Sequence, residues 1–173
     1  MSLRFAPLIL LAALCAPARA DAPLPAPEKH VVCANSGRFC ATSDPATNTT
    51  RVEMRGAKDP GYELPGWHRW MFVSDDGEHV VTGHDGVNLV PLHATLREPV
   101  LVFHERGKVV RTLVLGDLYA DLSQLTRTVS HRAWSDTVRL QGDRLVVKLV
   151  DGRVLAFDVR TGLPARMPGP ATR

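Results

Sequence analysis

The stretch "SDDGEHVVTGHDG", residues 74–86, decides the predicted fold, because two Asp-Gly pairs enclose a short apolar run. Asp-Gly between apolar runs is typical of a type I′ hairpin turn, whose two central residues need positive φ. Its acidic residues and histidines suggest a metal or catalytic site as the alternative interpretation. However, a strand points His79 and His84 to opposite faces, and the acids do not have EF-hand spacing. We therefore predict a turn, a strand and a second turn.

Turn signals recur along the rest of the chain about every ten residues, with runs rich in Val, Leu, Thr and Phe between them. They are Ser36-Gly37, Asp59-Pro60-Gly61, Arg106-Gly107, Gly142-Asp143, Asp151-Gly152 and Thr161-Gly162. Short strands separated in this way are typical of all-β proteins. We predict an all-β fold, an antiparallel meander of short hairpins that forms propeller-like sheets, a sandwich or a small barrel.

One segment, "GDLYADLSQL", departs from the strand pattern and predicts a short helix around 117–125. The side chain of Asp117 can cap its first turn. Leu118, Leu122 and Leu125 then fall on one face at helical spacing. This helix is expected to cover a sheet edge or an open end of the core.

The chain begins with "MSLRFAPLILLAALCAPARA", residues 1–20, which has the pattern of a Sec-type signal peptide. Arg4 supplies the positive charge, the apolar run Leu8–Ala16 follows, and Ala-Arg-Ala ends the segment. The run is too short to span a bilayer as a resident helix. Cleavage near Ala20–Asp21 predicts a periplasmic or secreted protein.

The remaining chain is predicted to hold one domain. Residues 21–29 are rich in proline and read as an extended leader, and residues 163–173 read as a flexible tail. Between them, 30–162 is expected to be a single β-rich domain. No further segment is long and apolar enough to suggest a transmembrane helix.

Two cysteines, Cys33 and Cys40, remain after the signal peptide. An even pair of cysteines in an exported protein predicts a disulfide. The intervening "ANSGRF" contains a turn-forming Asn-Ser-Gly that can close a hairpin and bring the two sulfurs together. The spacing is not the Cys-x-x-Cys of redox catalysts, and no further cysteine supports a zinc site.

The charge balance gives little reason to expect binding to nucleic acid or to an acidic membrane surface. The chain has 21 Lys and Arg against 18 Asp and Glu, for a formal net charge of +3. Two of the arginines leave with the signal peptide, and no dense basic run remains. Nucleic acid is therefore not expected as a partner.

The segment "DGRVLAFDVRTG", residues 151–162, resembles the repeat of quinoprotein-type β-propellers, Asp-Gly-x-apolar-x-Ala-apolar-Asp-x-x-Thr-Gly. The matching residues are Asp151, Gly152, Ala156, Phe157, Asp158, Thr161 and Gly162. The resemblance implies blade-like sheets in an exported protein. It implies no quinone, since the tryptophan that pads such blades is absent after "TGLP", and we expect no cofactor.

Polar aromatic residues concentrate in "GWHRW" and "SHRAW". The candidate ligand-binding residues are Trp67, His68, Trp70, His131 and Trp134. Because of their odd spacing, the two tryptophans of the first segment are expected on opposite strand faces, one in the core and one exposed for stacking. The two segments could meet to form an aromatic and histidine pocket.

Other catalytic or metal-binding patterns are not evident. Ser130 and His131 are adjacent, so a strand would point them apart and they are not expected to act as nucleophile and base. The remaining histidines lack the spacing of a metal site, and no metal site is predicted. No phosphate loop or dinucleotide fingerprint is present.

These patterns favour an exported, non-enzymatic binding or protein-interaction module whose partner is an envelope protein or a small ligand. The first alternative is an envelope hydrolase or metal-dependent enzyme that uses His68 and His131 with an acid. The second alternative is a structural half-propeller that is completed by formation of a homo-oligomer.

Overall fold

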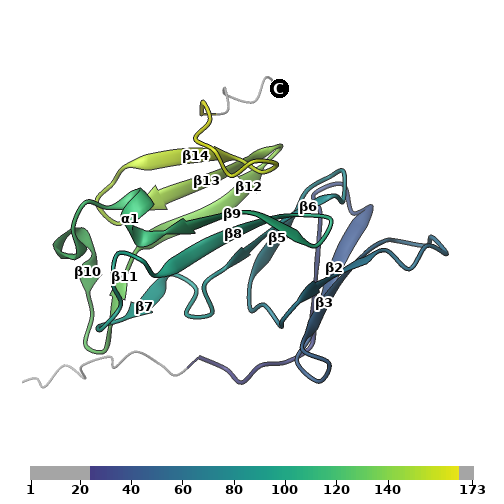
Figure 1. The fold of residues 1–173 in the computed structure, drawn as a ribbon, viewed down its shortest axis with the longest axis horizontal. Helices are drawn as coiled ribbons and strands as arrows, with labels where there is room; N and C mark the ends of the chain where they lie inside the picture. The colour runs from purple at the N-terminus through teal and green to yellow at the C-terminus, as the bar shows by residue number, and fades with distance from the viewer. Residues whose placement is uncertain (1–23, 168–173) are drawn as a thin grey trace, which may run out of the picture.

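The computed structural model describes residues 24–167; the expected signal peptide and the last residues of the expected tail lie outside this range. Within it, four antiparallel sheets confirm the predicted all-β class, and their arrangement is compatible with propeller-like blades (Figure 1). Sheet A has the strand order β1 (His30–Cys33), β2 (Phe39–Asp44), β3 (Thr49–Met54) and β4 (Tyr62–Pro65). Sheet B has the order β5 (Met71–Val73), β6 (His79–Gly83), β8 (Pro99–Glu105) and β9 (Lys108–Val114).

The other two sheets have three strands each. Sheet C has the order β10 (Thr126–Arg127), β11 (His131–Ala133) and β7 (Leu89–Pro91). Sheet D has the order β12 (Ser135–Gln141), β13 (Arg144–Leu149) and β14 (Val154–Asp158). In Figure 1, sheet B runs through the middle of the molecule, between sheet A on one side and sheets C and D on the other.

Strand β6 belongs to two hydrophobic cores at once. Val80 points into the core shared with sheet A, where it packs with residues such as Val52 and Leu64. Val81 points the other way, into a larger core with Phe103 of β8 and residues of sheet D. Both valines have no exposed surface. Strand alternation therefore gives β6 two buried faces, and its backbone joins the two halves of the molecule.

The two Asp-Gly turns beside β6 differ from the expected type I′ hairpins. In the first, Gly77 has a positive φ of 70° and Asp76 does not, and the Gly77 N–H donates to the Ser74 carbonyl at 3.0 Å. This pattern fits a turn that ends in a left-handed glycine. In the second, the positive φ, 60°, falls on Val87 rather than on Gly86. A β-branched residue rarely adopts this conformation.

The second turn opens a detour instead of a hairpin. Residues 84–98 leave sheet B after β6 and return as β8, and on the way they form β7. Strand β7 pairs with β11, which lies in the connection from β9 to β12. Two connections thus build sheet C together. The indole of Trp134 donates to the carbonyl of Val87 at 3.0 Å, and this bond holds the unusual turn.

The helical segment lies where it was predicted, but it is split into two short turns. An α-turn, α1 (Leu115–Leu118), precedes a 3-10 turn, η1 (Leu122–Gln124). Tyr119 between them is extended, with φ −133° and ψ 138°. Asp117 does not begin the helix as expected: Val114 is the N-cap residue, and Asp117, three residues further on, accepts a hydrogen bond from the N–H of Val114.

The predicted disulfide between Cys33 and Cys40 is confirmed. The two residues face each other across β1 and β2, with their Cα atoms 4.0 Å apart. The hairpin turn between them is closed by a hydrogen bond from the Ala34 N–H to the Phe39 carbonyl, 2.9 Å long. The bridge therefore fastens the edge strand of sheet A.

Both ends of the described chain are attached to the sheets. Side chains of the loop before β5 donate hydrogen bonds to the leader, and the start of the tail pairs with β14. Pro164 forms a bridge with Phe157, and the Ala165 N–H donates to the Ala156 carbonyl at 2.8 Å. In residues 24–167, no helix is both long and apolar enough to cross a membrane.

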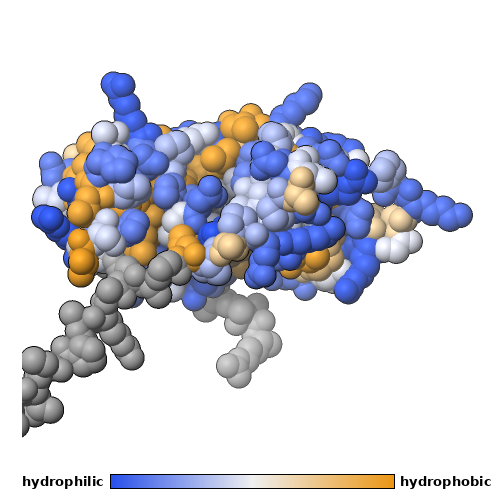
Figure 2. Space-filling view, turned by 90° about the horizontal axis from the view of Figure 1, so that it is seen from below, coloured by the Kyte–Doolittle hydropathy of each residue, from blue (hydrophilic) through white to orange (hydrophobic). Residues whose placement is uncertain are grey.

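The surface is mixed, with hydrophobic residues concentrated toward one end. Seen from below, they gather mainly at the end where Figure 1 places sheet C, while the rest of this face is largely hydrophilic (Figure 2). Val129, in the turn between β10 and β11, has the largest exposed fraction of the large hydrophobic side chains described, 76%.

Reduction of the disulfide should lower stability without changing the fold. The two cysteines are separated by 7 positions, so the bridge closes a short loop. By restricting the unfolded chain, it should stabilise the folded state by about 2.5 kcal/mol. We expect reductant to lower the melting temperature by about 5–10 °C. Scanning calorimetry with and without reductant measures this. The Cys33→Ala/Cys40→Ala variant is the control, and equal melting temperatures for the oxidised and reduced wild-type protein would contradict the prediction.

The tryptophans should differ sharply in their contribution to stability. Trp134→Phe leaves a cavity in the core and the Val87 carbonyl without its indole donor, so we expect a loss of about 2–4 kcal/mol. Trp67→Phe, at a partly exposed position, should cost less than about 1 kcal/mol. Urea unfolding of both variants compares them, and equal losses would argue against this assignment.

Candidate functional site

The two predicted aromatic segments meet through Trp70 and Trp134, whose ring centroids are 6.4 Å apart. Trp134 is fully buried, and the Tyr119 hydroxyl donates a hydrogen bond to its carbonyl. Trp70 lies against Gly83, where a Cβ would come within 1.8 Å of the indole ring. The meeting point therefore belongs to the hydrophobic core and offers no open pocket between the two rings.

Trp67 and His68 lie in the loop that joins sheet A to sheet B, and neither is fully buried. The guanidinium of Arg69 lies 5.0 Å from the centre of the Trp67 ring. His68 and Trp67 line an open hollow of about 330 Å³ together with His84 and Glu98. His84 Nε2 lies 3.5 Å from the nearer carboxylate oxygen of Glu98.

His131 begins β11 in sheet C, whereas the ring of His68 faces His104, with 6.3 Å between the ring centroids. The prediction that Ser130 and His131 point apart is wrong: the Ser130 hydroxyl lies 2.8 Å from His131 Nδ1. Strand alternation does not apply, because Ser130 is in the turn before the strand. Neither residue lines any of the hollows described here.

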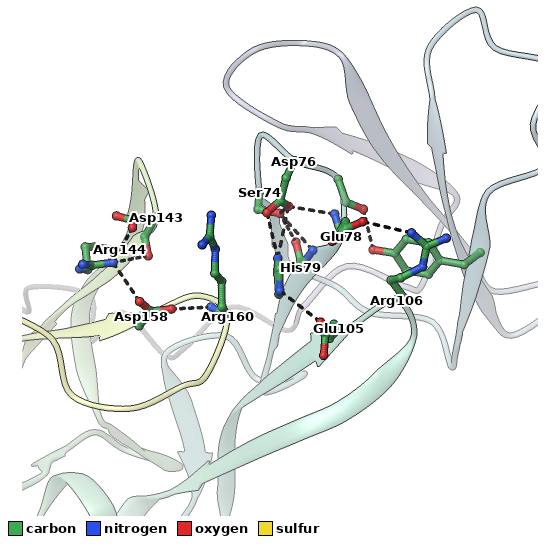
Figure 3. A network of polar contacts seen from close by, with 12 residues as sticks. Ser74, Asp76, Glu78, His79, Glu105, Arg106, Asp143, Arg144, Asp158 and Arg160 are labelled. Carbon is green, nitrogen blue, oxygen red and sulfur yellow. Dashed lines mark hydrogen bonds and ion pairs between the residues drawn. The ribbon is translucent and has the colours of Figure 1, made fainter.

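The opening stretch forms a network of polar contacts, which Figure 3 shows. Asp76 accepts hydrogen bonds from the Ser74 hydroxyl and, at 2.9 Å, from the Glu78 N–H. His79 Nδ1 lies 3.1 Å from the same carboxylate, and its Nε2 is 4.0 Å from Glu105. Buried between two carboxylates, the imidazole ties the turn to strand β8.

The charge of Asp76 is stabilised in this position. Burial acts to raise the pKa of its carboxyl group, but hydrogen bonds from Ser74, the Glu78 N–H and His79 outweigh burial. They hold the pKa of Asp76 below its ordinary value, so the group remains ionised at neutral pH. A carboxylate is thus fixed in the turn.

The combination of Ser74, Asp76 and His79 does not have the geometry of a nucleophile activated by a base. The Ser74 hydroxyl has one proton to donate and lies within hydrogen-bond distance of two acceptors, the Asp76 carboxylate and the His79 carbonyl, the latter at 2.9 Å; it accepts from the His79 N–H at 3.1 Å. An activated serine instead donates to an imidazole nitrogen. The three residues lock the hairpin between β5 and β6.

The locked hairpin separates two hollows. On the side of sheet D, an open hollow of about 240 Å³ lies between Asp76 and Arg160. Figure 3 shows a second charged cluster there, in which Arg144 lies between two carboxylates. Its guanidinium is 2.7 Å from Asp143 and 3.1 Å from Asp158, so these charges pair among themselves.

On the side of sheet A lies a groove of about 330 Å³, which we call the acidic groove. It is lined by Phe39, Val52, Glu53, Met54, Ala57, Asp59, Gly61, Tyr62, Asp76, Gly77, Glu78 and Arg106. Its apolar lining comes from sheet A and the adjoining loop. Its charged residues come from β3, the loop between β3 and β4, the β5–β6 turn and the β8–β9 turn.

The walls of the acidic groove touch at Gly77. A Cβ there would come within 2.2 Å of the Phe39 ring, so the turn can approach sheet A only with glycine at this position. The Tyr62 hydroxyl donates to the Gly77 carbonyl at 2.9 Å. Burial raises the pKa of Tyr62, so the hydroxyl remains a donor across the physiological range. This contact closes the bottom of the groove.

The charge of the acidic groove is predominantly negative. Glu78 pairs with Arg106 at 3.1 Å. Neither Glu53 nor Asp59 has a basic side chain within ion-pair distance in the part of the chain that the structure describes. Arg55 and Lys58 belong to the same loop but do not line the groove. An apolar floor with free carboxylates at its rim suits a basic, partly apolar ligand.

Sequence reasoning assigned Asp76 and Glu78 to a turn and did not find their place in a groove. The sequence holds only a weak indication of the groove, namely that Asp59-Pro60-Gly61 and Asp76-Gly77 are both turns that contain an acidic residue. Only the packing of β5 and β6 against sheet A shows that these turns lie together. The predicted candidates, in contrast, lie in the core, in sheet C and beside His84.

Comparisons with known proteins do not add a family: no family model matches this chain, and no curated protein matches it. Among residues 24–167, no group of three or more His, Cys, Asp or Glu side chains is arranged to hold a metal ion. The geometry described above is therefore the basis for the function.

His104 should make stability depend on pH. Its ring is buried beside Thr82, at 3.1 Å, and burial together with the nearby His68 lowers the pKa of His104 to about 4. Within the described residues, its Nδ1 has no hydrogen-bond partner. In the unfolded chain the pKa of His104 is near 6.5. As pH falls from about 6.5 to about 4, His104 is therefore protonated in the unfolded chain but remains neutral in the folded protein.

We therefore expect the free energy of unfolding to fall across this window by up to about 3 kcal/mol from His104, with no further loss below it. His104→Gln should flatten the dependence. Urea unfolding at several pH values measures it, with the exposed His93→Gln as the matched control. The same pH slope in wild type and in His104→Gln would refute the assignment.

Proposed function

We propose that this protein is an exported, non-enzymatic binding module whose acidic groove holds an extended basic segment of a partner protein in the cell envelope. The observation that carries the proposal is the groove itself. It combines an apolar floor from sheet A with the unpaired carboxylates of Glu53 and Asp59 and the ionised Asp76. The proposal of export rests on the signal-peptide pattern and is compatible with the disulfide.

The groove is suited to recognition because its walls are held in place before any ligand arrives. Asp76 is fixed by three donors, and Tyr62 and Gly77 are joined by a hydrogen bond. The turn between β8 and β9 also packs on sheet A, where a Cβ on Gly107 would come within 2.4 Å of the Glu63 carbonyl. Rigid walls lower the entropy lost on binding.

Chemical complementarity defines the ligand. Lysine or arginine side chains can pair with Glu53 and Asp59 at the rim, while their apolar neighbours contact Phe39 and the half-exposed Met54. The charged lining comes from several separate turns and strands, which favours an extended segment with several side chains over a compact ion. Because the carboxylates are exposed, each ion pair contributes little, and the apolar contacts are needed for affinity.

A labelled peptide in which lysine alternates with leucine should bind, and the matched peptide with glutamate for lysine should not. We expect Glu53→Gln/Asp59→Asn to weaken binding roughly fivefold, because two ion pairs are lost. Fluorescence anisotropy measures both affinities. Binding should also weaken as the ionic strength rises.

The control is Asp136→Asn/Asp143→Asn, which changes the net charge equally but alters sheet D. It should bind the lysine peptide as the wild-type protein does. The proposal fails if the groove variant and the control variant bind alike, or if the glutamate peptide binds as tightly as the lysine peptide.

A further inference from the structure

The leader is bound to the surface by its backbone carbonyls. Figure 1 shows it running beneath the molecule, toward sheet A. Arg69 Nη2 donates to the Pro25 carbonyl at 2.9 Å, and the Trp67 indole Nε1 donates to the Glu28 carbonyl, also at 2.9 Å. At the end of the leader, Lys29 pairs with Asp44 at 3.0 Å. No strand forms in residues 24–29.

The two accepting carbonyls are three residues apart, which is the repeat of the polyproline II helix. In that conformation the carbonyls of positions i and i+3 project from the same side. The sequence "PLPAPE" favours it strongly, since each proline restricts its own φ and prolines disfavour the helical region for Leu24 and Ala26 before them. The leader therefore presents its acceptors at the required spacing with little loss of entropy.

The two donors are held in place by other parts of the fold. Arg69 Nε donates to the Asp85 carbonyl at 3.1 Å, and its guanidinium is stacked on the Trp67 ring. The backbone N–H of Trp67 donates to Asn48 Oδ1 at 3.0 Å, and His30 packs edge-on against the indole, with 5.9 Å between ring centroids. Trp67 and Arg69 thus form a rigid pair of donors.

We propose that the Trp67–Arg69 surface is a binding site for proline-rich, extended segments of a partner protein, and that the leader occupies it in competition with that partner. Both bonds go to main-chain carbonyls, so the site recognises the polyproline II repeat more than particular side chains. The leader is held by two such bonds and an exposed ion pair, with Leu24 half-exposed. Such a contact is weak enough to be displaced.

This site lies apart from the acidic groove, with which it shares no residue. The two proposals therefore fail or stand independently. The acidic groove selects for basic side chains, whereas the Trp67–Arg69 surface selects for backbone conformation.

A labelled peptide of residues 21–30, DAPLPAPEKH, tests the site in the full exported chain. In the wild-type protein the attached leader competes at a high effective concentration, so the peptide should bind weakly. In the Pro25→Gly/Pro27→Gly variant the attached leader loses its rigid conformation. We expect the peptide to bind this variant about tenfold more tightly, as measured by fluorescence anisotropy.

Further variants distinguish specific recognition of the peptide from non-specific binding. Adding Trp67→Phe to the loosened variant removes the indole donor and should abolish most of the gain, while Asp136→Asn on sheet D should not change it. A second donor variant, Arg69→Gln, gives the same test without altering the aromatic ring. Near-ultraviolet circular dichroism verifies that each variant is folded.

A peptide with glycine in place of both prolines should compete poorly with the labelled peptide. The proposal is overturned if the loosened variant shows no gain, if Trp67→Phe and Arg69→Gln leave binding unchanged, or if the glycine peptide competes equally. It is also overturned if light scattering shows that the loosened variant forms a dimer that excludes the peptide, which would assign the surface to a second copy.

Discussion

The burial of β6 on both faces is the constraint on which the rest of the structure depends. Val80 and Val81 are adjacent and fully buried, and they belong to two different cores. A strand with two apolar faces must have a layer on each side, because exposing either face to water is costly. Sheet A and sheet D fill these positions, and the turns beside β6 are thereby brought between the layers.

This arrangement explains why the polar network and the acidic groove lie where they do. The turn before β6 emerges between sheet A and sheet D, so its acids face hollows on both sides (Figure 3). The Ser74, Asp76 and His79 contacts hold that turn rigid, and Gly77 lets it touch the Phe39 ring. The fold and the acidic groove therefore share the same residues, and a mutation at Asp76 would disturb both.

The motif "GWHRW" shows how one short segment serves two roles. Trp70 packs on Gly83 in the core, while Trp67 stays at the surface and holds the leader. From strand alternation the sequence predicts one core and one exposed tryptophan. Both tryptophans instead lie in the loop before β5 and both are partly buried, so alternation does not explain their placement. The sequence could not predict that the leader binds Trp67. Glu28 and Trp67 are 39 positions apart in the chain and meet only after folding.

The sequence by itself determined the all-β class, most strand positions, the site of the helical turns and the disulfide. These depend on local patterns: alternation, turn residues and cysteine spacing act over a few neighbouring positions. The tertiary structure alone decided that Asp85 and Gly86 open a detour rather than a hairpin, since β7 has its partner β11 some forty positions away. It also decided that Ser130 touches His131 and that acids from separate turns share one groove. Such features depend on packing between distant segments, and no local pattern encodes them.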